Sequence, residues 1–527
     1  MATWCSYSPS HRALAASFLA AGLVACSAPR LDVPRTVSEA WPRPEETALG
    51  RGFKQQAASG QSGFFLLVSG MEAFSVRASL AEAAERTLDL QYYIVRDDTT
   101  TQLLLSRVLR AAERGVRVRL LIDDLDAAGR DLDLAVLSAH RNLEVRVFNP
   151  FLRRGALGLS KLLEFLGDSD RLNRRMHNKL WIADNAVAIV GGRNLGDEYF
   201  DAHGELNFSD LDILAAGPVA RDISRSFDAY WNSEWAVPIE AFAAKRPGAE
   251  QLAQLSRGLQ ARVAGFRDTE YARALRDTGL GSLLRSGQLP LVGAQASALH
   301  DPPVKISGTG ADTPPRQVFA ARLTPIVEAA QREIILISPY FIPGEEGIAR
   351  LAGLVRRGIR VRLLTNSLAS TDFVPLAYSG YARVRPRLLA AGVELYEMRP
   401  AANSTGATRR PAASSFGYLH AKAIVVDRRH VVVGSMNLDP RSRQSNTEVA
   451  VLLESAELGL RLGALFDEAV QPARAFRVEL ARNDPAQPVW VAEEAGTEVR
   501  YDREPLAGIW RRFLAKLLGV FAPEDLL

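Results

Sequence analysis

The second half of this 527-residue chain repeats the first half. The segment Arg114–Leu121 recurs as Arg357–Leu364, a shift of 243 residues from Arg114 to Arg357. The same shift relates Gly191-Gly192 to Gly434-Ser435 and matches four polar pairs: His177 with His420, Lys179 with Lys422, Asp184 with Asp427, and Asn194 with Asn437. The length allows roughly two to four domains. Two copies of a His-x-Lys motif predict one active site built from two half-sites.

Histidine is scarce in this chain, so its placement is informative. Two of the seven histidines occupy matching positions of the repeat, each two residues before a lysine. A single histidine is usually a core or surface imidazole without a chemical role. Two in register, each with Lys, Asp and Asn at matching spacings, favour a role in catalysis.

The repeat predicts an α/β fold of two tandem sandwich domains. A strand, a helix and a second strand follow one another in each half, which is the pattern of a right-handed βαβ unit. We expect mixed, largely parallel sheets flanked by helices and one shared active site. The expected elements are a strand at Leu88–Val95, a helix at Gln102–Glu113 and a strand at Val116–Ile122, then a strand at Glu333–Tyr340, a helix at Glu346–Arg357 and a strand at Ile359–Leu364.

Composition shifts divide the rest of the chain. Ile239–Leu299 is rich in Ala, Leu, Arg and Gln and is predicted to be helical, and a hairpin is expected around Glu494–Gly496. Asn403–Ser415 precedes the second histidine and is either a lid over the substrate or an ordinary surface loop. The predicted divisions are a signal peptide (1–25), a tether (26–60), the first domain (61–238), a helical insert and connector (239–315), the second domain (316–475) and a C-terminal extension (476–527).

The N-terminus predicts export and a lipid anchor. An apolar run at Ala13–Ala25 follows His11-Arg12 and has the size of a signal-peptide core. It ends in Leu23-Val-Ala-Cys26, which resembles a bacterial lipobox, so Cys26 is the expected lipidation site. An uncleaved anchor is the alternative. We expect a membrane-anchored lipoprotein of the cell envelope that faces the periplasm.

Two further segments combine apolar and basic residues. The expected helix Gly508–Phe521 and the stretch Phe151–Leu166 can each lie in a membrane interface or pack against the protein's own core. The formal charge of +4 favours an anionic partner such as a phospholipid, a nucleic acid or a phosphate ester. Cys5 and Cys26 are the only cysteines, which argues against a disulfide framework or a cysteine zinc cluster.

The paired motifs suit chemistry on a phosphodiester. His177–Ala183 is predicted to be a strand, whose period of two places His177 and Lys179 on one face. His420 and Lys422 have the same spacing. Charge that develops on the phosphoryl oxygens would be stabilised by the lysines and by a phosphate-binding set of Asn194, Asn437 and Ser435. We expect neither a metal nor another cofactor.

One imidazole can attack phosphorus while the other protonates the leaving alcohol. A carboxylate beside each ring would fix its tautomer. Asp210 and Glu448 follow their histidines at comparable distances, and Asp212 competes with Asp210 for this role. The candidate catalytic set is therefore the two motifs, His177, Lys179, Asp184, His420, Lys422 and Asp427. Within this set, the two aspartates follow apolar strand residues at turn positions and are interpreted as structural.

Two HxK(x4)D motifs, each followed by GG or GS and then Asn, resemble the phospholipase D superfamily. The flanking segments resemble bacterial cardiolipin synthases of the C type from about Gly70 onward, namely Gly192–Phe200, Ser338–Gly344, Thr365–Asp372 and Asn437–Ser442. Tyr378 stands where that subgroup is expected to have a histidine. The resemblance implies two phospholipase D-like domains, with His177 as the nucleophile and His420 as the acid and base.

The resemblance also implies phosphatidyl transfer. Cardiolipin would form from phosphatidylglycerol and a second phospholipid through a phosphohistidine intermediate, and the partners would be anionic and zwitterionic phospholipids and a membrane surface. No nucleic acid is expected as a partner, and a helper protein remains open.

Two other classes of function use the same residues. A phospholipase D or nuclease would replace the alcohol acceptor with water, although a nuclease is expected to have denser basic runs along a groove. A noncatalytic lipid-binding lipoprotein would keep the fold as a phosphate cradle. The intact His-x-Lys pairs argue against this last alternative.

Overall fold

The computed structural model describes residues 33–53, 60–127, 130–152, 164, 167–243, 246–307, 318–371, 375–400, 417–484 and 486–521. Several predicted features lie outside these residues. They are the signal peptide with Cys26, the loop Asn403–Ser415, most of the stretch Phe151–Leu166 and the last part of the insert and connector, 308–315.

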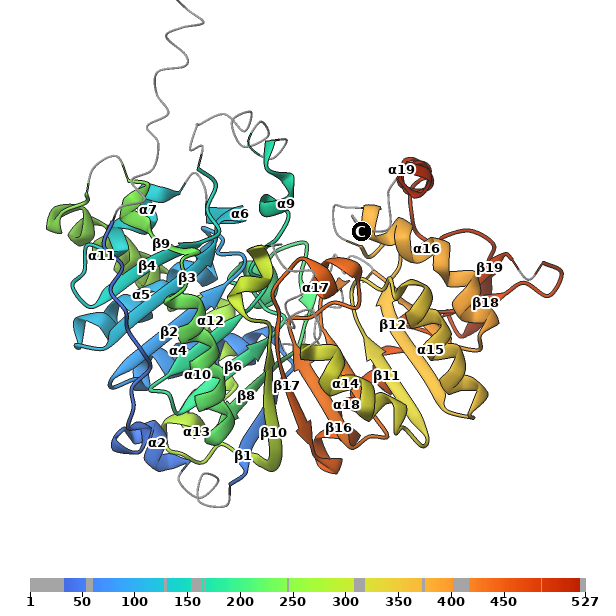
Figure 1. The fold of residues 1–527 in the computed structure, drawn as a ribbon, viewed down its shortest axis with the longest axis horizontal. Helices are drawn as coiled ribbons and strands as arrows, with labels where there is room; N and C mark the ends of the chain where they lie inside the picture. Colours follow the sequence, from blue (N-terminus) through green and yellow to red (C-terminus); the bar gives the residue numbers. More distant parts are fainter. Residues whose placement is uncertain are drawn as a thin grey trace, which may run out of the picture.

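The first repeat forms a mixed sheet with helices on its faces (Figure 1). Its three central strands are parallel and the others pair antiparallel. The strand order is β9 (Ala236–Pro238), β4 (Leu143–Phe148), β3 (Arg117–Asp123), β2 (Thr87–Tyr92), β5 (Leu180–Ala183), β6 (Val187–Gly191), β8 (Asp212–Ala216) and β1 (Ser62–Leu67). The main helices are α4 (Gly70–Ala83), α5 (Thr99–Glu113), α7 (Asp131–Leu137) and α10 (Pro218–Trp231), with short turns at α2 (Ala48–Gly52), α6 (Asp124–Ala127) and α9 (Ser169–Leu172).

The second repeat has the same arrangement. Its parallel centre is again followed by antiparallel strands on both sides. The order is β20 (Thr497–Tyr501), β19 (Pro488–Glu494), β18 (Ala475–Leu480), β13 (Glu394–Met398), β12 (Arg360–Asn366), β11 (Glu333–Ile337), β15 (Ala423–Val426), β16 (His430–Gly434) and β17 (Val449–Glu454). The helices are α14 (Val318–Glu328), α15 (Gly344–Arg356), α16 (Pro375–Ala390), α17 (Pro440–Gln444), α18 (Ala456–Ala469) and α19 (Ile509–Phe521).

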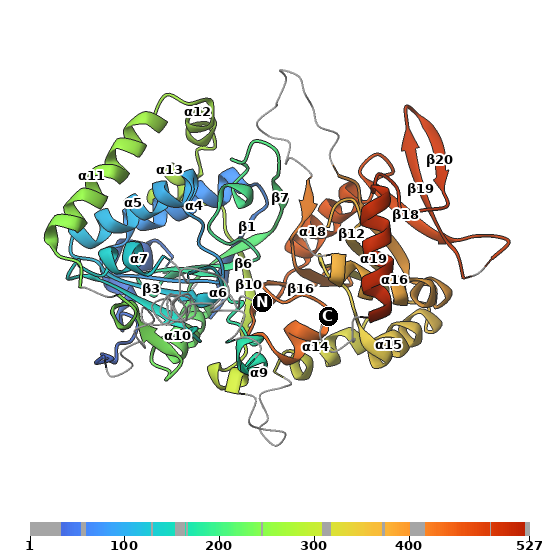
Figure 2. The same ribbon diagram turned by 90° about the horizontal axis from the view of Figure 1, so that it is seen from above.

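Strand β10 (Val292–His300) joins the two sheets. It pairs antiparallel with β1 on one side and with β17 on the other. The prediction that Ile239–Leu299 is helical is therefore wrong for its last part, because hydrogen bonds to β1 and β17 stabilise that part as a strand. The earlier part of the segment contains the helices α11 (Ala249–Phe266), α12 (Glu270–Asp277) and α13 (Leu280–Arg285), which lie along α4 and α5 (Figure 2).

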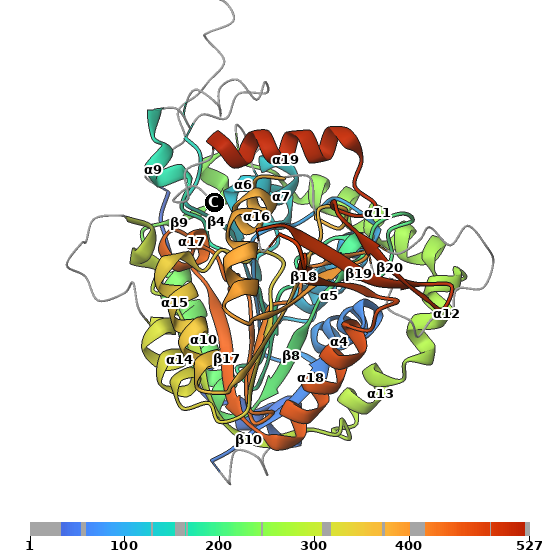
Figure 3. The same cartoon turned by 90° about the vertical axis from the view of Figure 1, so that its right-hand side faces the viewer.

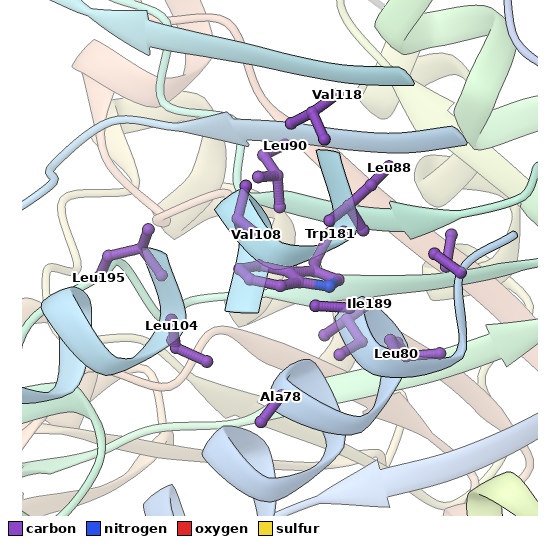
Figure 4. Packing of buried hydrophobic residues seen from close by; sticks show 14 of the residues in the cluster. Ala78, Leu80, Leu88, Leu90, Leu104, Val108, Val118, Trp181, Ile189 and Leu195 are labelled. Atoms are coloured by element: carbon purple, nitrogen blue, oxygen red, sulfur yellow. The ribbon is translucent and has the colours of Figure 1, made fainter. Parts of the chain in front are cut away.

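The described residues form three hydrophobic cores. One lies between the first sheet and α4 and α5, where Trp181 is surrounded by apolar side chains that include Leu104 and Val108 (Figure 4). A second lies on the outer side of the second sheet. The third contains residues of both repeats, such as Ile182 and Val425, and lies where the halves meet. Burial of this third core fixes how the two half-sites face each other.

The βαβ units agree with the predicted pattern, with shifts of a few residues at the boundaries. One difference affects the motifs, since β5 begins at Leu180 and β15 at Ala423. His177, Lys179, His420 and Lys422 therefore precede the strands and do not pair in the sheet ladders. The strand predicted at His177–Ala183 is correct only in its second half.

The C-terminal extension contains the expected hairpin and helix. Ala495 and Gly496 have φ of 50° and 81°, the left-handed values of a tight turn between β19 and β20. Helix α19 lies along α16 at the edge of the molecule (Figure 3). Among the described residues, no helix is both long enough and apolar enough to cross a bilayer.

Candidate active site

Each histidine is carried by a segment that pairs with the other repeat. Met176 forms a parallel bridge with Thr447, and the His177 N–H donates to the Thr447 carbonyl at 2.9 Å. In the other half-site, β14 (Tyr418–Leu419) pairs with β7 (Phe208–Ser209), and the His420 N–H donates to the Ser209 carbonyl at 2.8 Å. These contacts bring both motifs to the interface between the repeats.

The carboxylates that hold the two rings are exchanged between the repeats. Nδ1 of His177 lies 3.0 Å from Oε2 of Glu448, and Nδ1 of His420 lies 2.6 Å from Oδ2 of Asp210. The sequence predicts that each acid orients the histidine of its own repeat, and the structure corrects that pairing. Asp212, the alternative to Asp210, is instead bound to the buried Arg77 at 2.8 Å.

Glu448 is held by two serines. Ser442 donates to Oε1 at 2.7 Å and Ser435 donates to Oε2 at 2.5 Å. Ser435 was predicted to bind phosphate, but its hydroxyl positions this carboxyl. At the matching position of the first repeat, a Cβ on Gly192 would lie 2.1 Å from Oδ1 of Asp210. Glycine is needed there because the Asp210 carboxylate occupies the space of a side chain.

The two acids titrate differently. Burial raises the pKa of Glu448 to about 7, although Lys179 and the serines oppose this shift. Burial acts in the same direction on Asp210, but the neighbouring His420 and Lys422 outweigh it and hold its pKa below the ordinary value. Asp210 is therefore ionised at neutral pH, whereas Glu448 is close to its titration point.

Both imidazoles have lowered pKa values, which favours their neutral forms before substrate binds. Burial, followed by the charges of Lys179 and Lys422, lowers the pKa of His177 well below its ordinary value. Burial and Lys422 lower the pKa of His420 to about 4, against the opposing effect of Asp210. If each Nδ1 carries its proton toward its carboxylate, each Nε2 presents a lone pair to the site.

The lysines flank the rings. Lys179 Nζ donates to the carbonyl of His177 at 2.6 Å and lies 5.2 Å from the ring centre of Tyr93. Burial lowers its pKa well below the ordinary value for lysine. Lys422 Nζ lies 3.0 Å from Nδ1 of His420 and also donates to the His420 carbonyl. A phosphodiester anion between the two lysines would favour their charged forms, because its negative charge compensates for the solvation that burial removes.

The two asparagines are not equivalent. Asn194 accepts a hydrogen bond from the Ile94 N–H at 3.1 Å and donates to the Tyr199 hydroxyl at 2.9 Å. Asn437 is also buried, but its Oδ1 has no hydrogen-bond partner among the described residues. Phosphate binding by either residue stays a prediction.

Aromatic side chains wall the site, and sequence reasoning missed them. The ring centre of Tyr93 lies 5.0 Å from that of His177. Tyr199 and Phe208 lie 5.3 and 5.2 Å from the ring of His420. Phe208 belongs to β7, whose pairing with β14 positions His420, so its role depends on docking between the repeats and left no local signal in the sequence.

The motif aspartates are structural, as their turn positions predicted, and not catalytic. Asp184, with φ of 56°, accepts hydrogen bonds from the backbone N–H groups of Glu85, Arg86 and Thr87. Asp427, with φ of 52°, does the same for Gln331, Arg332 and Glu333. Each aspartate ties the turn after its motif strand to the start of the neighbouring strand.

The chain matches known proteins over both half-sites. The sequence model described as "Cardiolipin synthase, PLD-like domain" matches residues 77–231 and 323–470. The cardiolipin synthase C of Escherichia coli (strain K12) is 38% identical over 473 residues, which cover 89% of this chain and 97% of that protein. The chain belongs to the phospholipase D-like cardiolipin synthase family.

Other members of this family and fold are more distant. A cardiolipin synthase A of Pseudomonas putida (strain GB-1) is 25% identical over 79% of this chain and 70% of that protein. The crystal structure of a phosphatidylserine synthase of Haemophilus influenzae Rd KW20 aligns with a TM-score of 0.55 at 14% identity, covering 90% of this chain and all of that one. This second likeness supports the two-domain phospholipase D-like fold.

Tyr378, the departure noted within the cardiolipin synthase resemblance, is buried in α16. Its hydroxyl accepts a hydrogen bond from Arg385 at 2.7 Å, and Arg385 is also bound to the buried Glu397 at 3.0 Å. Tyr378 thus belongs to a buried polar cluster. Within the described part of the chain, no group of three or more His, Cys, Asp and Glu side chains is arranged to hold a metal.

Proposed function

We propose that this protein is a phosphatidyltransferase that makes cardiolipin from phosphatidylglycerol and a second phospholipid. The observation that carries the proposal is the pair of imidazoles, one buried and one largely buried, each oriented by a carboxylate of the opposite repeat. The family to which the chain belongs supports the choice of a phospholipid substrate.

In the first step, Nε2 of His177 attacks phosphorus and forms a P–N bond. The bond from phosphorus to the leaving alcohol oxygen breaks, and His420 donates a proton to that oxygen. The anionic substrate offsets the charge of Lys422 and so raises the pKa of His420, which Asp210 then stabilises as imidazolium. In the second step, His420 removes the proton of an acceptor hydroxyl, whose oxygen displaces His177.

Transfer requires that an alcohol reach the phosphohistidine in place of water. The aromatic rings of Tyr93, Tyr199 and Phe208 support this, since they lie beside the imidazoles and occupy space that water would otherwise fill. The second candidate is a phospholipase D that uses the same residues with water as the acceptor.

Product analysis tests the proposal. Purified protein is given phosphatidylglycerol, alone and with phosphatidylethanolamine, beside the His177→Ala and His420→Ala variants. We expect cardiolipin from the wild-type protein and none from either variant. Phosphatidic acid as the sole product would favour the hydrolase, and an absence of turnover with any lipid would contradict both candidates.

Helix α19 supports docking on a membrane surface. It packs on α16 through the buried Ala515, while Trp510 and Phe513 on its other side are 80% and 57% exposed. The helix carries Arg511, Arg512 and Lys516 and no acidic residue, which favours an anionic lipid surface. It lies at the same end of the molecule as α17, whose Ser442 holds Glu448 (Figures 1 and 3).

Liposome binding tests this orientation. A double variant, Trp510→Glu with Phe513→Glu, should sediment less with phosphatidylglycerol vesicles than the wild-type protein, both carrying Cys26→Ser to remove the proposed anchor. Leu460→Glu is the matched control, because Leu460 is 56% exposed on α18. Equal loss in the control would refute a specific role for α19.

We further propose that Cys26 is lipidated and anchors the protein in the cell envelope, facing the periplasm. The lipobox-like Leu23–Cys26 carries this proposal. Mass spectrometry of the N-terminus should find acyl chains on Cys26 and none in the Cys26→Ser variant. An N-terminus that begins at Met1, without acylation, would contradict it.

A further inference from the structure

We propose that an apolar cavity in the second repeat binds an acyl chain of the phospholipid held at the reaction centre. This inference rests on the proposed function, because it assigns a place to part of the same substrate. The cavity has a volume of about 250 Å³ and lies between the second sheet, α14 and α15. Its lining is mainly apolar and includes Phe319, Leu323, Leu336, Leu351, Ile424 and Met436. Charged residues also line it, and two of them, Lys305 and Asp301, are paired with each other at 2.8 Å.

The cavity exists because the repeats differ at three matching positions. With the shift of 243 residues, Leu104 corresponds to Gly347, Trp181 to Ile424 and Tyr199 to Ser442. The three larger side chains are fully or almost fully buried in the first repeat, where Figure 4 shows Trp181 among its apolar neighbours. The three smaller residues all line the cavity of the second repeat.

The backbone keeps one of these positions empty. A Cβ on Gly347 would lie 2.6 Å from Cβ of Pro343, so a side chain there would require the preceding turn to move. Glycine at the start of α15 and isoleucine in place of tryptophan therefore leave space on the same side of the sheet. Cores normally fill such space, since each missing side chain forfeits packing contacts.

The cavity adjoins the active site. Asn437 of the second motif lines it, and so does Ser442, whose hydroxyl holds Glu448 at 2.7 Å. Glu448 in turn lies 3.0 Å from the ring of His177. Ser442 and Glu448 therefore connect the lining of the cavity to the ring of His177.

The lining selects an alkyl ligand. Water needs polar partners, and an apolar cavity of about 150 Å³ is already large enough to stay dry and bind a small hydrocarbon. A phospholipid presents an alkyl chain a few bonds from its phosphate. Placing the chain here would remove it from water while the phosphate stays between the two motifs.

Filling the cavity should shorten the chain that the enzyme accepts. Ile424→Trp installs the residue of the first repeat, and Val327→Phe fills the cavity from α14. Ala352→Leu is the matched control, because it also installs a first-repeat residue, that of Leu109, on α15 but outside the cavity lining. The measurement is kcat/KM for dioleoyl and dioctanoyl phosphatidylglycerol in mixed micelles.

We expect Ile424→Trp and Val327→Phe to lower the ratio of long-chain to short-chain kcat/KM by tenfold or more, with little loss on the short chain. Each methylene removed from the cavity weakens binding by roughly fourfold. Ala352→Leu should keep the wild-type ratio. Wild-type ratios in both filled variants, with unchanged Tm, would overturn the inference.

A binding measurement separates this inference from the proposed function. Lauroyl lysophosphatidylglycerol is titrated calorimetrically below its micelle concentration into the wild-type protein and the same variants. Binding by the wild type and Ala352→Leu, with at least tenfold weaker binding by Ile424→Trp, supports the site even if no cardiolipin forms. Equal binding by all three overturns it, whatever the outcome of the product analysis.

Discussion

The exchanged carboxylates predict that Asp210→Asn and Glu448→Gln fail at different chemical steps. Asp210 lies 2.6 Å from the ring that is assigned as the acid, and Glu448 lies 3.0 Å from the ring that is assigned as the nucleophile. A leaving group of low pKa needs no proton. A phosphatidyl p-nitrophenol should therefore bypass the acid and not the nucleophile.

The magnitude follows from the buried, charge-assisted hydrogen bond. A hydrogen bond to a charged group contributes about 1.5–3 kcal/mol, which corresponds to roughly 10- to 150-fold in rate if it is made in the transition state. Asp210→Asn should lose that factor with phosphatidylglycerol and almost nothing in the burst of p-nitrophenol. Glu448→Gln should lose a similar factor with both substrates, because the attacking imidazole loses its orienting partner.

Rapid mixing measures the burst, which reports only formation of the phosphohistidine. Glu454→Gln, an exposed strand residue, serves as the control and should match the wild-type protein. A normal burst in Glu448→Gln together with a lost burst in Asp210→Asn would reverse the assignment and make His420 the nucleophile. Equal losses in both variants with both substrates would refute the division of labour.

Three further predictions follow from the same contacts. The folded pKa of Glu448 is raised to about 7, so this carboxyl favours folding below its unfolded pKa and loses that contribution as pH rises through about 7. Glu448→Gln should therefore gain stability relative to the wild-type protein between pH 5 and pH 8. A difference in Tm between the two proteins that stays constant over this pH range would contradict the prediction. Asp184→Ala should lower the free energy of unfolding by about 3 kcal/mol and Asp427→Ala by about 1 kcal/mol, since Asp184 is the more buried. Chemical denaturation measures the two free energies, and the folded fraction of each variant should keep its turnover. Gly192→Ser should displace Asp210 and reproduce the effect of Asp210→Asn. Ser435→Gly should lower turnover about tenfold by releasing Glu448. Wild-type rates in either variant would show that the position does not orient its carboxylate.

The repeat predicted much of the fold, because hydrophobic periodicity and spacing are local properties of the sequence. The βαβ units and the two motifs could be placed from matched residues such as Arg114 and Arg357. The turn role of Asp184 and Asp427 also followed from their position after apolar strands. These inferences needed no knowledge of how the halves dock.

The remaining features depend on docking. Glu448 reaches His177 because Met176 pairs with Thr447, and no local pattern near either residue specifies that bridge. Helical composition hid β10, whose strand conformation is stabilised by partners from both sheets. The cavity beside Asn437 arises from small residues that are far apart in the chain and acquire meaning only when the repeats are superposed.

The exchange of carboxylates makes the two halves chemically interdependent. Since each histidine takes its orienting acid from the opposite repeat, neither half contains a complete half-site. A chain in which one domain has folded and the other has not would hold an imidazole without its carboxylate, and so would be inert toward the phospholipids around it. Catalytic activity therefore requires that the two domains have docked correctly. Two separately expressed halves should regain turnover only when they associate.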